Sequence, residues 1–121
     1  MKYEEMADLK EVVNKLKEAF PEKLSHVQAD RIFYLCFSKK TSDTKGRICT
    51  IQPKFAVFLK DKEYLLEIHK ESWLAFDIPM RLYVVLHELT HIPEGGFNEQ
   101  SKEYKKTVKH DVQDFKDLVR T

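Results

Sequence analysis

The chain has 121 residues, of which 42% are hydrophobic, 34% charged and 12% aromatic, a composition typical of one folded domain rather than a disordered or membrane-embedded chain. Its 21 basic and 20 acidic side chains give a net charge of +1, which does not favour binding to nucleic acid or to anionic lipid. The N-terminus carries acids where a secretion signal would have a basic segment and an apolar core, and no stretch resembles a transmembrane helix. We therefore expect a cytoplasmic protein.

The first predicted element is an amphipathic helix over Tyr3–Phe20. Apolar residues recur there at intervals of three and four, with lysine and glutamate between them. Pro21 ends the helix, because proline has no backbone N–H to continue the hydrogen-bond ladder. We expect the apolar stripe to contribute to the core.

Three short segments rich in β-forming residues predict strands over Ile32–Phe37, Arg47–Gln52 and Tyr64–His69. The segment Phe55–Leu59, between the second and third of them, can be a strand or a helical turn. His26 and His69 are expected to be ordinary loop and strand residues without a functional role.

The first two strands can form a hairpin, with Asp30–Ser38 paired to Arg47–Gln52 around the loop Thr41–Gly46. This hairpin would place Cys36 opposite Cys49, so that a disulfide is geometrically possible. Two reduced cysteines remain the commoner arrangement in a cytosolic protein. The sequence leaves both states open.

The strongest chemical signal is His-Glu-x-x-His, at residues 87–91 within a helix predicted around Met80–Ile92, with Asp77 as its N-cap. Histidines at positions i and i+4 project from one face of a helix, so His87 and His91 can bind a single zinc ion. Glu88 would face the open metal position. The pattern implies hydrolysis by a water molecule whose pKa is lowered by zinc and whose proton is taken by Glu88.

The same helix is predicted to separate its core face from its metal face. An apolar stripe is expected to pack on the sheet, and it comprises Ile78, Leu82, Val85, Leu89 and Ile92. The opposite side would carry Tyr83 and the residues of the motif.

A catalytic zinc usually has three protein ligands, so the motif supplies one too few. A metzincin-type site would need Gly at position 94 and His at position 97, where this chain has Glu94 and Phe97. A thermolysin-like site would take a glutamate from a later helix, but the last glutamate, Glu103, lies only 12 residues beyond His91. This spacing disfavours a glutamate ligand.

The remaining candidates lie on a C-terminal helix predicted over residues 98–118, after a turn at Pro93 and the two following glycines. His110, 19 residues beyond His91, is the expected third ligand. Asp111 is the alternative, and it lies about 100° around the helix from His110. Asp114, one turn after His110, is a candidate hydrogen-bond partner for its imidazole.

Two segments of the chain, residues 85–93 and 109–115, resemble the His-Glu-Leu-x-His-Ile and His-Asp-Val-x-x-Phe motifs of the phage metallopeptidases. This family lies within the broad zincin group and is related in outline to SprT-like proteases. The resemblance covers roughly Asp30 to Phe115. It implies that His87, His91 and His110 bind zinc and that Glu88 is the catalytic base, but it supplies no substrate.

These features predict one zincin-like domain over residues 1–121, with an α+β fold. A small mixed or antiparallel sheet would pack against the N-terminal helix, the active-site helix and the C-terminal helix. The expected function is zinc-dependent hydrolysis of a peptide or protein substrate. Two alternatives stay open: a zinc-stabilised binding module without catalysis, and a SprT-like nucleic-acid-associated protease domain, suggested in part by lysines at positions 102, 105, 106 and 109.

Overall fold

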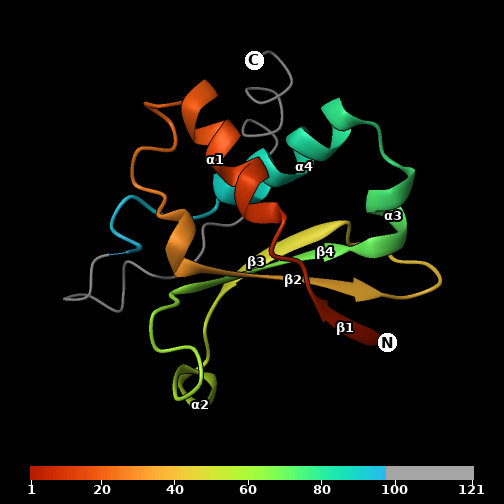
Figure 1. Ribbon diagram of the computed structural model, residues 1–121, viewed down its shortest axis with the longest axis horizontal. Coiled ribbons are helices and arrows are strands. Elements are labelled where there is room, and N and C mark those ends of the chain that lie inside the picture. Colours follow the sequence, from red (N-terminus) through yellow and green to blue (C-terminus); the bar gives the residue numbers. More distant parts are fainter. Residues whose placement is uncertain (98–121) are drawn as a thin grey trace.

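The structure, a computed structural model, describes residues 1–97 and has an α+β architecture with a small mixed sheet (Figure 1). The strands are β1 (Lys2–Glu5), β2 (Ile32–Ser38), β3 (Gly46–Thr50) and β4 (Tyr64–His69). The helices are α1 (Leu9–Ala19), α2 (Pro53–Ala56), α3 (Lys70–Ala75) and α4 (Ile78–Leu89), with a short 3₁₀ helix η1 (Ala29–Arg31) before β2. The predicted C-terminal helix lies outside the described residues.

The sheet has the strand order β1-β2-β4-β3, so the predicted hairpin between β2 and β3 is wrong. β4 lies between them, parallel to β2 and antiparallel to β3. β2 and β4 are the strands richest in buried residues, and a central position hides both of their faces. Cys36 pairs in register with Ile68 and Cys49 with Leu65, so β4 separates the two cysteines, and both thiols are free.

The N-terminal helix is shorter than predicted, because residues 2–5 form strand β1. β1 pairs antiparallel with β2, and the ring of Tyr3 lies 6.5 Å from that of Phe37. The edge of β2 satisfies backbone groups that a first helical turn would leave without partners. The rest of the stripe is as predicted, since Leu9, Val13 and Leu16 of α1 are buried.

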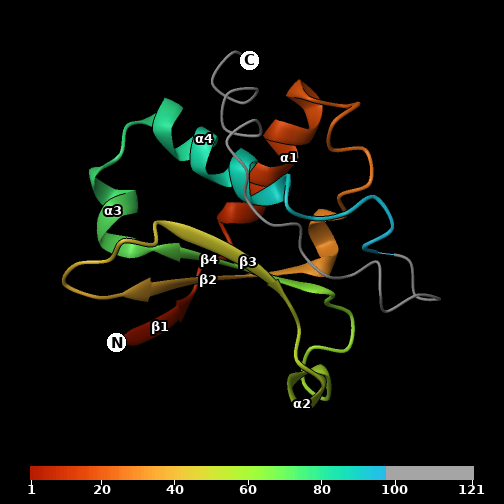
Figure 2. The same cartoon turned by 180° about the vertical axis from the view of Figure 1, so that it is seen from behind.

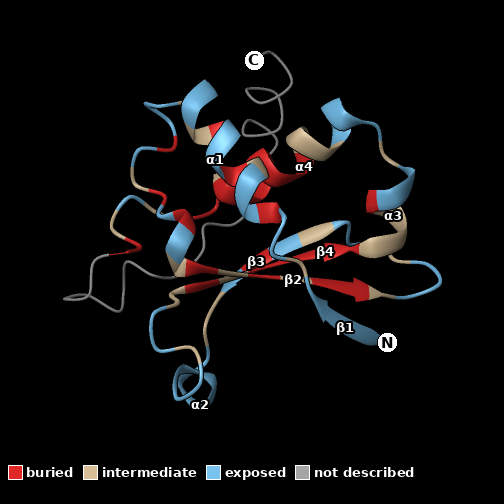
Figure 3. Ribbon diagram, in the orientation of Figure 1, coloured by how far each residue is buried: buried red, intermediate tan, exposed pale blue. Residues whose placement is uncertain are grey.

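Helices α1, α3 and α4 lie on one side of the sheet, whereas α2 lies on the other (Figures 1 and 2). The core between the sheet and the three helices appears as the buried segments of Figure 3. The ambiguous segment begins within α2 and is exposed, with Phe58 82% accessible. Within residues 1–97, every helix is too short or too polar to cross a membrane.

His69 is a structural residue at the junction of β4 and α3, and it is buried rather than at the surface. Its Nδ1 accepts a hydrogen bond from the backbone N–H of Ser72 (3.3 Å), which caps α3. Its Nε2 lies 2.8 Å from the carbonyl oxygen of Lys39 and therefore carries the proton. These hydrogen bonds account for the burial of the His69 imidazole without a bound metal.

Candidate metal centre

Helix α4 begins as its sequence predicts. Asp77 is the N-cap, with its Oδ1 accepting a hydrogen bond from the backbone N–H of Met80 (3.0 Å), and Pro79 lies in the first turn. The helix ends earlier than predicted, at Leu89, so His91 lies just beyond it. The backbone N–H of His91 donates to the carbonyl of Glu88 (3.1 Å), a 3₁₀-type bond that keeps His91 close to a helical position.

The two histidines of the motif bring their Nε2 atoms to within 3.4 Å of each other, with their rings edge to face. Two nitrogens bound tetrahedrally to one zinc at about 2.0–2.1 Å lie about 3.3–3.4 Å apart. His87 and His91 are both buried, and neutral imidazole is a common zinc ligand. The pair therefore fits two ligand positions of a single zinc ion.

Glu88 is buried beside this pair, and burial raises the pKa of its carboxyl group to about 7. The side chain lies against Gly46 of β3, where an added Cβ would be only 3.4 Å from Glu88 Cγ and 3.2 Å from Val84 Cγ1. Glycine at this position thus allows α4 to approach β3 closely.

The predicted division of α4 into a sheet-facing apolar stripe and an opposite metal face is only partly confirmed. Val85, Leu89 and Ile92 of the stripe are in the core, but the motif face is buried as well. Helix α4 packs against both α1 and β3, and Val84 and Glu88 contact β3 at Gly46. The motif residues are buried together with Val85 and Leu89, while Ile78 of the predicted stripe is 69% exposed. A helix packed against two elements buries more than one face.

A cleft of about 330 Å³ opens beside the motif. One wall is formed by residues 43–46, which are the end of the loop before β3 and its first residue. The other wall is α4, and it includes His87 and Glu88. The ring of Tyr83 stacks on that of His87 with an interplanar angle of 18°. The loop wall is not predictable from the sequence, because its place beside α4 depends on the position of β3 at the sheet edge.

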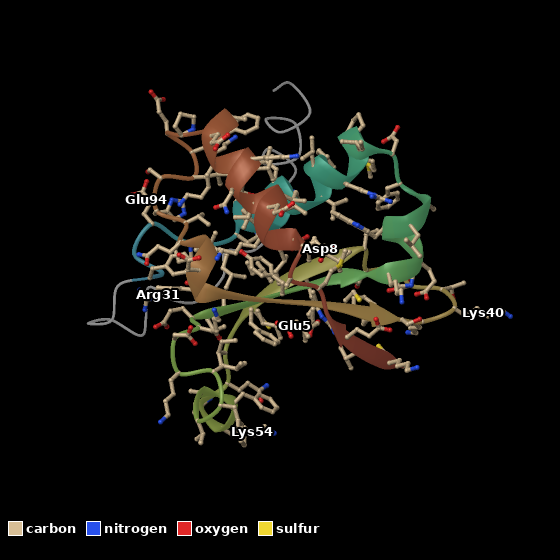
Figure 4. The ribbon with its side chains drawn as sticks, viewed as in Figure 1. Glu5, Asp8, Arg31, Lys40, Lys54 and Glu94 are labelled. Carbon is tan, nitrogen blue, oxygen red and sulfur yellow. The ribbon has the colours of Figure 1, made fainter. Side chains whose placement is uncertain are left out.

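The turn after the motif is held by two residues from η1 and the loop before it. His26 donates from Nε2 to the carbonyl oxygen of Ile92 (2.8 Å). Arg31 donates to the carbonyl oxygen of Phe97 (2.8 Å) and to the carboxylate of Glu63 (2.6 Å). In Figure 4, Arg31 and Glu94 lie on the same side of the molecule. The contacts with the carbonyl groups of Ile92 and Phe97 each span 66 residues of sequence, so no local pattern predicts them.

Gly96 of this turn packs directly on Tyr64, and its replacement by alanine is expected to destabilise the fold. A Cβ there would overlap the Tyr64 hydroxyl and lie 3.0 Å from the carbonyl oxygen of Pro93. We expect Gly96→Ala to lower the free energy of unfolding by about 1–3 kcal/mol, the usual cost of an overpacked site. Urea denaturation followed by circular dichroism measures this change.

The control is a double-mutant cycle with Tyr64→Phe. Within the part of the chain that the structure describes, the Tyr64 hydroxyl is buried without a hydrogen-bond partner, so its loss alone is expected to be nearly neutral. Adding Tyr64→Phe to Gly96→Ala removes the overlapping oxygen and is expected to recover part of the lost stability. Equal losses in the single and double variants would contradict this account.

Residues 1–97 contain no group of three His, Cys, Asp or Glu side chains arranged around one metal position. The sequence-predicted third ligand, His110, and its alternative, Asp111, lie outside the described residues, as do Asp114 and the lysines behind the nucleic-acid alternative. The structure thus brings together His87, His91 and Glu88. The third ligand stays a prediction.

A family model described as "Putative phage metallopeptidase" matches the chain over residues 1–121. Comparison with curated proteins and with solved structures gives no significant match. A metallopeptidase uses a metal cofactor to hydrolyse peptide or protein substrates, which agrees with the buried histidine pair beside an acid. By this match, the chain belongs to the phage metallopeptidase family.

Proposed function

We propose that this protein is a zinc-dependent peptidase with His87, His91 and His110 as metal ligands and Glu88 as the general base. The 3.4 Å separation of the two Nε2 atoms carries the proposal, because it equals the spacing of two nitrogen ligands on one tetrahedral zinc. Glu88 lies between the two histidines in sequence and supplies a base. The cleft that it lines provides a place for the substrate.

When bound, zinc supplies Lewis-acid chemistry, which makes water a usable nucleophile near neutral pH. Glu88 lines the cleft, so its carboxylate can accept the proton of the attacking water and return it to the leaving amine. Burial raises the pKa of Glu88 to about 7, and a cation on the neighbouring imidazoles would lower this pKa and favour the carboxylate that accepts a proton. The burial of His87 and His91 restricts competition from bulk water.

The experiment that tests this function is metal removal from the full chain. We expect purified protein to contain about one zinc per chain, and to hydrolyse an unfolded protein such as casein. Treatment with a chelator is expected to abolish hydrolysis, and added Zn²⁺ to restore it. Zinc content is measured by mass spectrometry and hydrolysis by release of labelled peptides; full activity after complete metal removal would overturn the proposal.

The same histidine pair also fits a zinc-stabilised binding module, and the experiment separates the two functions. In a binding module, zinc would serve folding, so chelation would lower the melting temperature while no substrate was cut under any condition. In a peptidase, the same treatment removes an activity that was present before it.

A further inference from the structure

We propose that the peptidase described above has a subsite for an apolar substrate side chain, formed by Met80 and Tyr83 of α4. The subsite would lie next to the candidate metal centre and favour substrates with an aromatic or large aliphatic residue close to the cleaved bond. This inference rests on the proposed function, because it assigns a substrate preference to the same site.

Two hollows on the surface of α4 meet at these residues. The first is the cleft of about 330 Å³ that contains His87 and Glu88. The second, of about 570 Å³, lies toward the start of the helix between α3 and α4, and Phe76 and Pro79 are among its lining residues. Met80 and Tyr83 line both hollows, so the two adjoin along α4, and together they are called the groove.

The groove follows a single stripe of the helix. Met80, Tyr83 and His87 are spaced by three and four residues, with Val84 beside them, and such positions share one face. With a rise of 1.5 Å per residue, the subsite lies about 6–10 Å from His87 along the helix axis. An extended peptide covers that distance with about two or three residues. The bound side chain would therefore be within about three residues of the cleaved bond.

The side chains of the groove suit an apolar group. Met80 is 38% exposed, and its flexible thioether adapts to neighbouring apolar shapes, whereas the Tyr83 ring stacks on that of His87 and offers a flat apolar face. The combined hollows have room for a large side chain. Burial of such a side chain in the groove favours binding through the hydrophobic effect.

The charged residues near the groove disfavour an acidic substrate side chain. Arg81 donates from Nε to the carbonyl oxygen of Trp73 (2.9 Å) and lies over the Trp73 ring. Asp77 caps the helix at the backbone N–H of Met80. The opposite wall carries one acidic and one basic residue, Asp43 and Lys45. Asp77 and Glu88 also line the two hollows, so an apolar side chain fits this groove better than an acidic one.

The test measures peptide binding separately from cleavage. Fluorescein-labelled peptides of Gly and Ala, each with Phe, Leu, Asp or Lys at one position, are titrated with zinc-loaded Glu88→Gln protein, and binding is followed by fluorescence polarisation. We expect the Phe and Leu peptides to bind about 10–100 times more tightly than the Asp peptide. Met80→Glu, in the same background, is expected to abolish this preference and to favour the Lys peptide.

The matched control is Ile78→Glu, which adds the same charge two residues earlier on the same helix. Ile78 is 69% exposed and lines neither hollow, so this variant is expected to keep the preference for Phe and Leu. Met80→Lys provides a second variant, expected to favour the Asp peptide. Thermal melts of every variant show that binding is compared between folded proteins.

Cleavage of the same peptides by protein with Glu88 intact distinguishes the subsite from the function. Peptides that bind with the apolar preference but are never cut would refute the peptidase and leave the subsite standing. Peptides that are cut without regard to the variable residue, or identical preferences in Met80→Glu and Ile78→Glu, would overturn the subsite. Absence of both binding and cleavage would refute both.

Discussion

Replacing Glu88 with glutamine is expected to lower kcat/KM for peptide hydrolysis by about 10²- to 10⁴-fold, the usual contribution of a general base. An amide has nearly the same size as the carboxyl group, so it fits beside Gly46, but it cannot accept a proton from water. Zinc binding is expected to persist, because neither histidine changes. Initial rates on a quenched fluorescent peptide mixture and the zinc content of the same sample provide the two measurements.

The matched control for this change is Glu94→Gln, which removes the same charge from an exposed residue in the turn after the motif. Glu94 lines neither hollow of α4, so its variant is expected to hydrolyse the mixture at the wild-type rate. This comparison separates a loss of the base from a general change in net charge. Wild-type kcat/KM in zinc-loaded Glu88→Gln would contradict the role of Glu88.

The elements that sequence analysis predicted well are those that local patterns determine. The cap of α4 follows from the short reach of the Asp77 side chain to the first turn, and the central strands follow from dense runs of β-forming residues. The convergence of His87 and His91 likewise follows from helical spacing alone, even though α4 ends between them. Side chains that meet within one helical turn can therefore be predicted from the sequence.

The errors concern contacts between distant parts of the chain. Nothing local to residues 32–52 shows that β4 will insert between β2 and β3, and the wrong hairpin placed Cys36 opposite Cys49. The correct order puts β3 at the sheet edge, where Gly46 contacts α4 and forms a wall of the cleft. The cleft wall formed by residues 43–46 thus depends on the order of the strands, which the periodicity of apolar residues does not determine.

The turn that follows the motif also depends on contacts with distant parts of the chain. His26 was expected to be an ordinary loop residue, yet it holds the carbonyl of Ile92. Arg31 anchors Phe97, the last described residue. These two contacts fix the end of the turn that carries His91. A change at either residue would therefore act on the candidate metal centre through the backbone, without altering the proposed metal ligands.

His110→Ala is expected to weaken zinc binding by about 10²- to 10³-fold. The free energy of binding at a structural four-ligand zinc site is about 10–16 kcal/mol, so one ligand contributes roughly a quarter of it. Asp111→Ala is expected to keep wild-type affinity, because His110 is the proposed third ligand. Competition with a chromophoric chelator measures both dissociation constants at fixed pH.

The pair of variants is informative because adjacent residues of the predicted C-terminal helix would point about 100° apart, so only one of them could readily join His87 and His91. His87→Ala, which removes a residue of the buried pair, gives the reference loss for one ligand. A His110→Ala loss equal to this reference, with Asp111→Ala unchanged, would establish a three-histidine site. The reverse result would assign the third position to the carboxylate, and the more negative ligand would then make the bound metal a weaker Lewis acid.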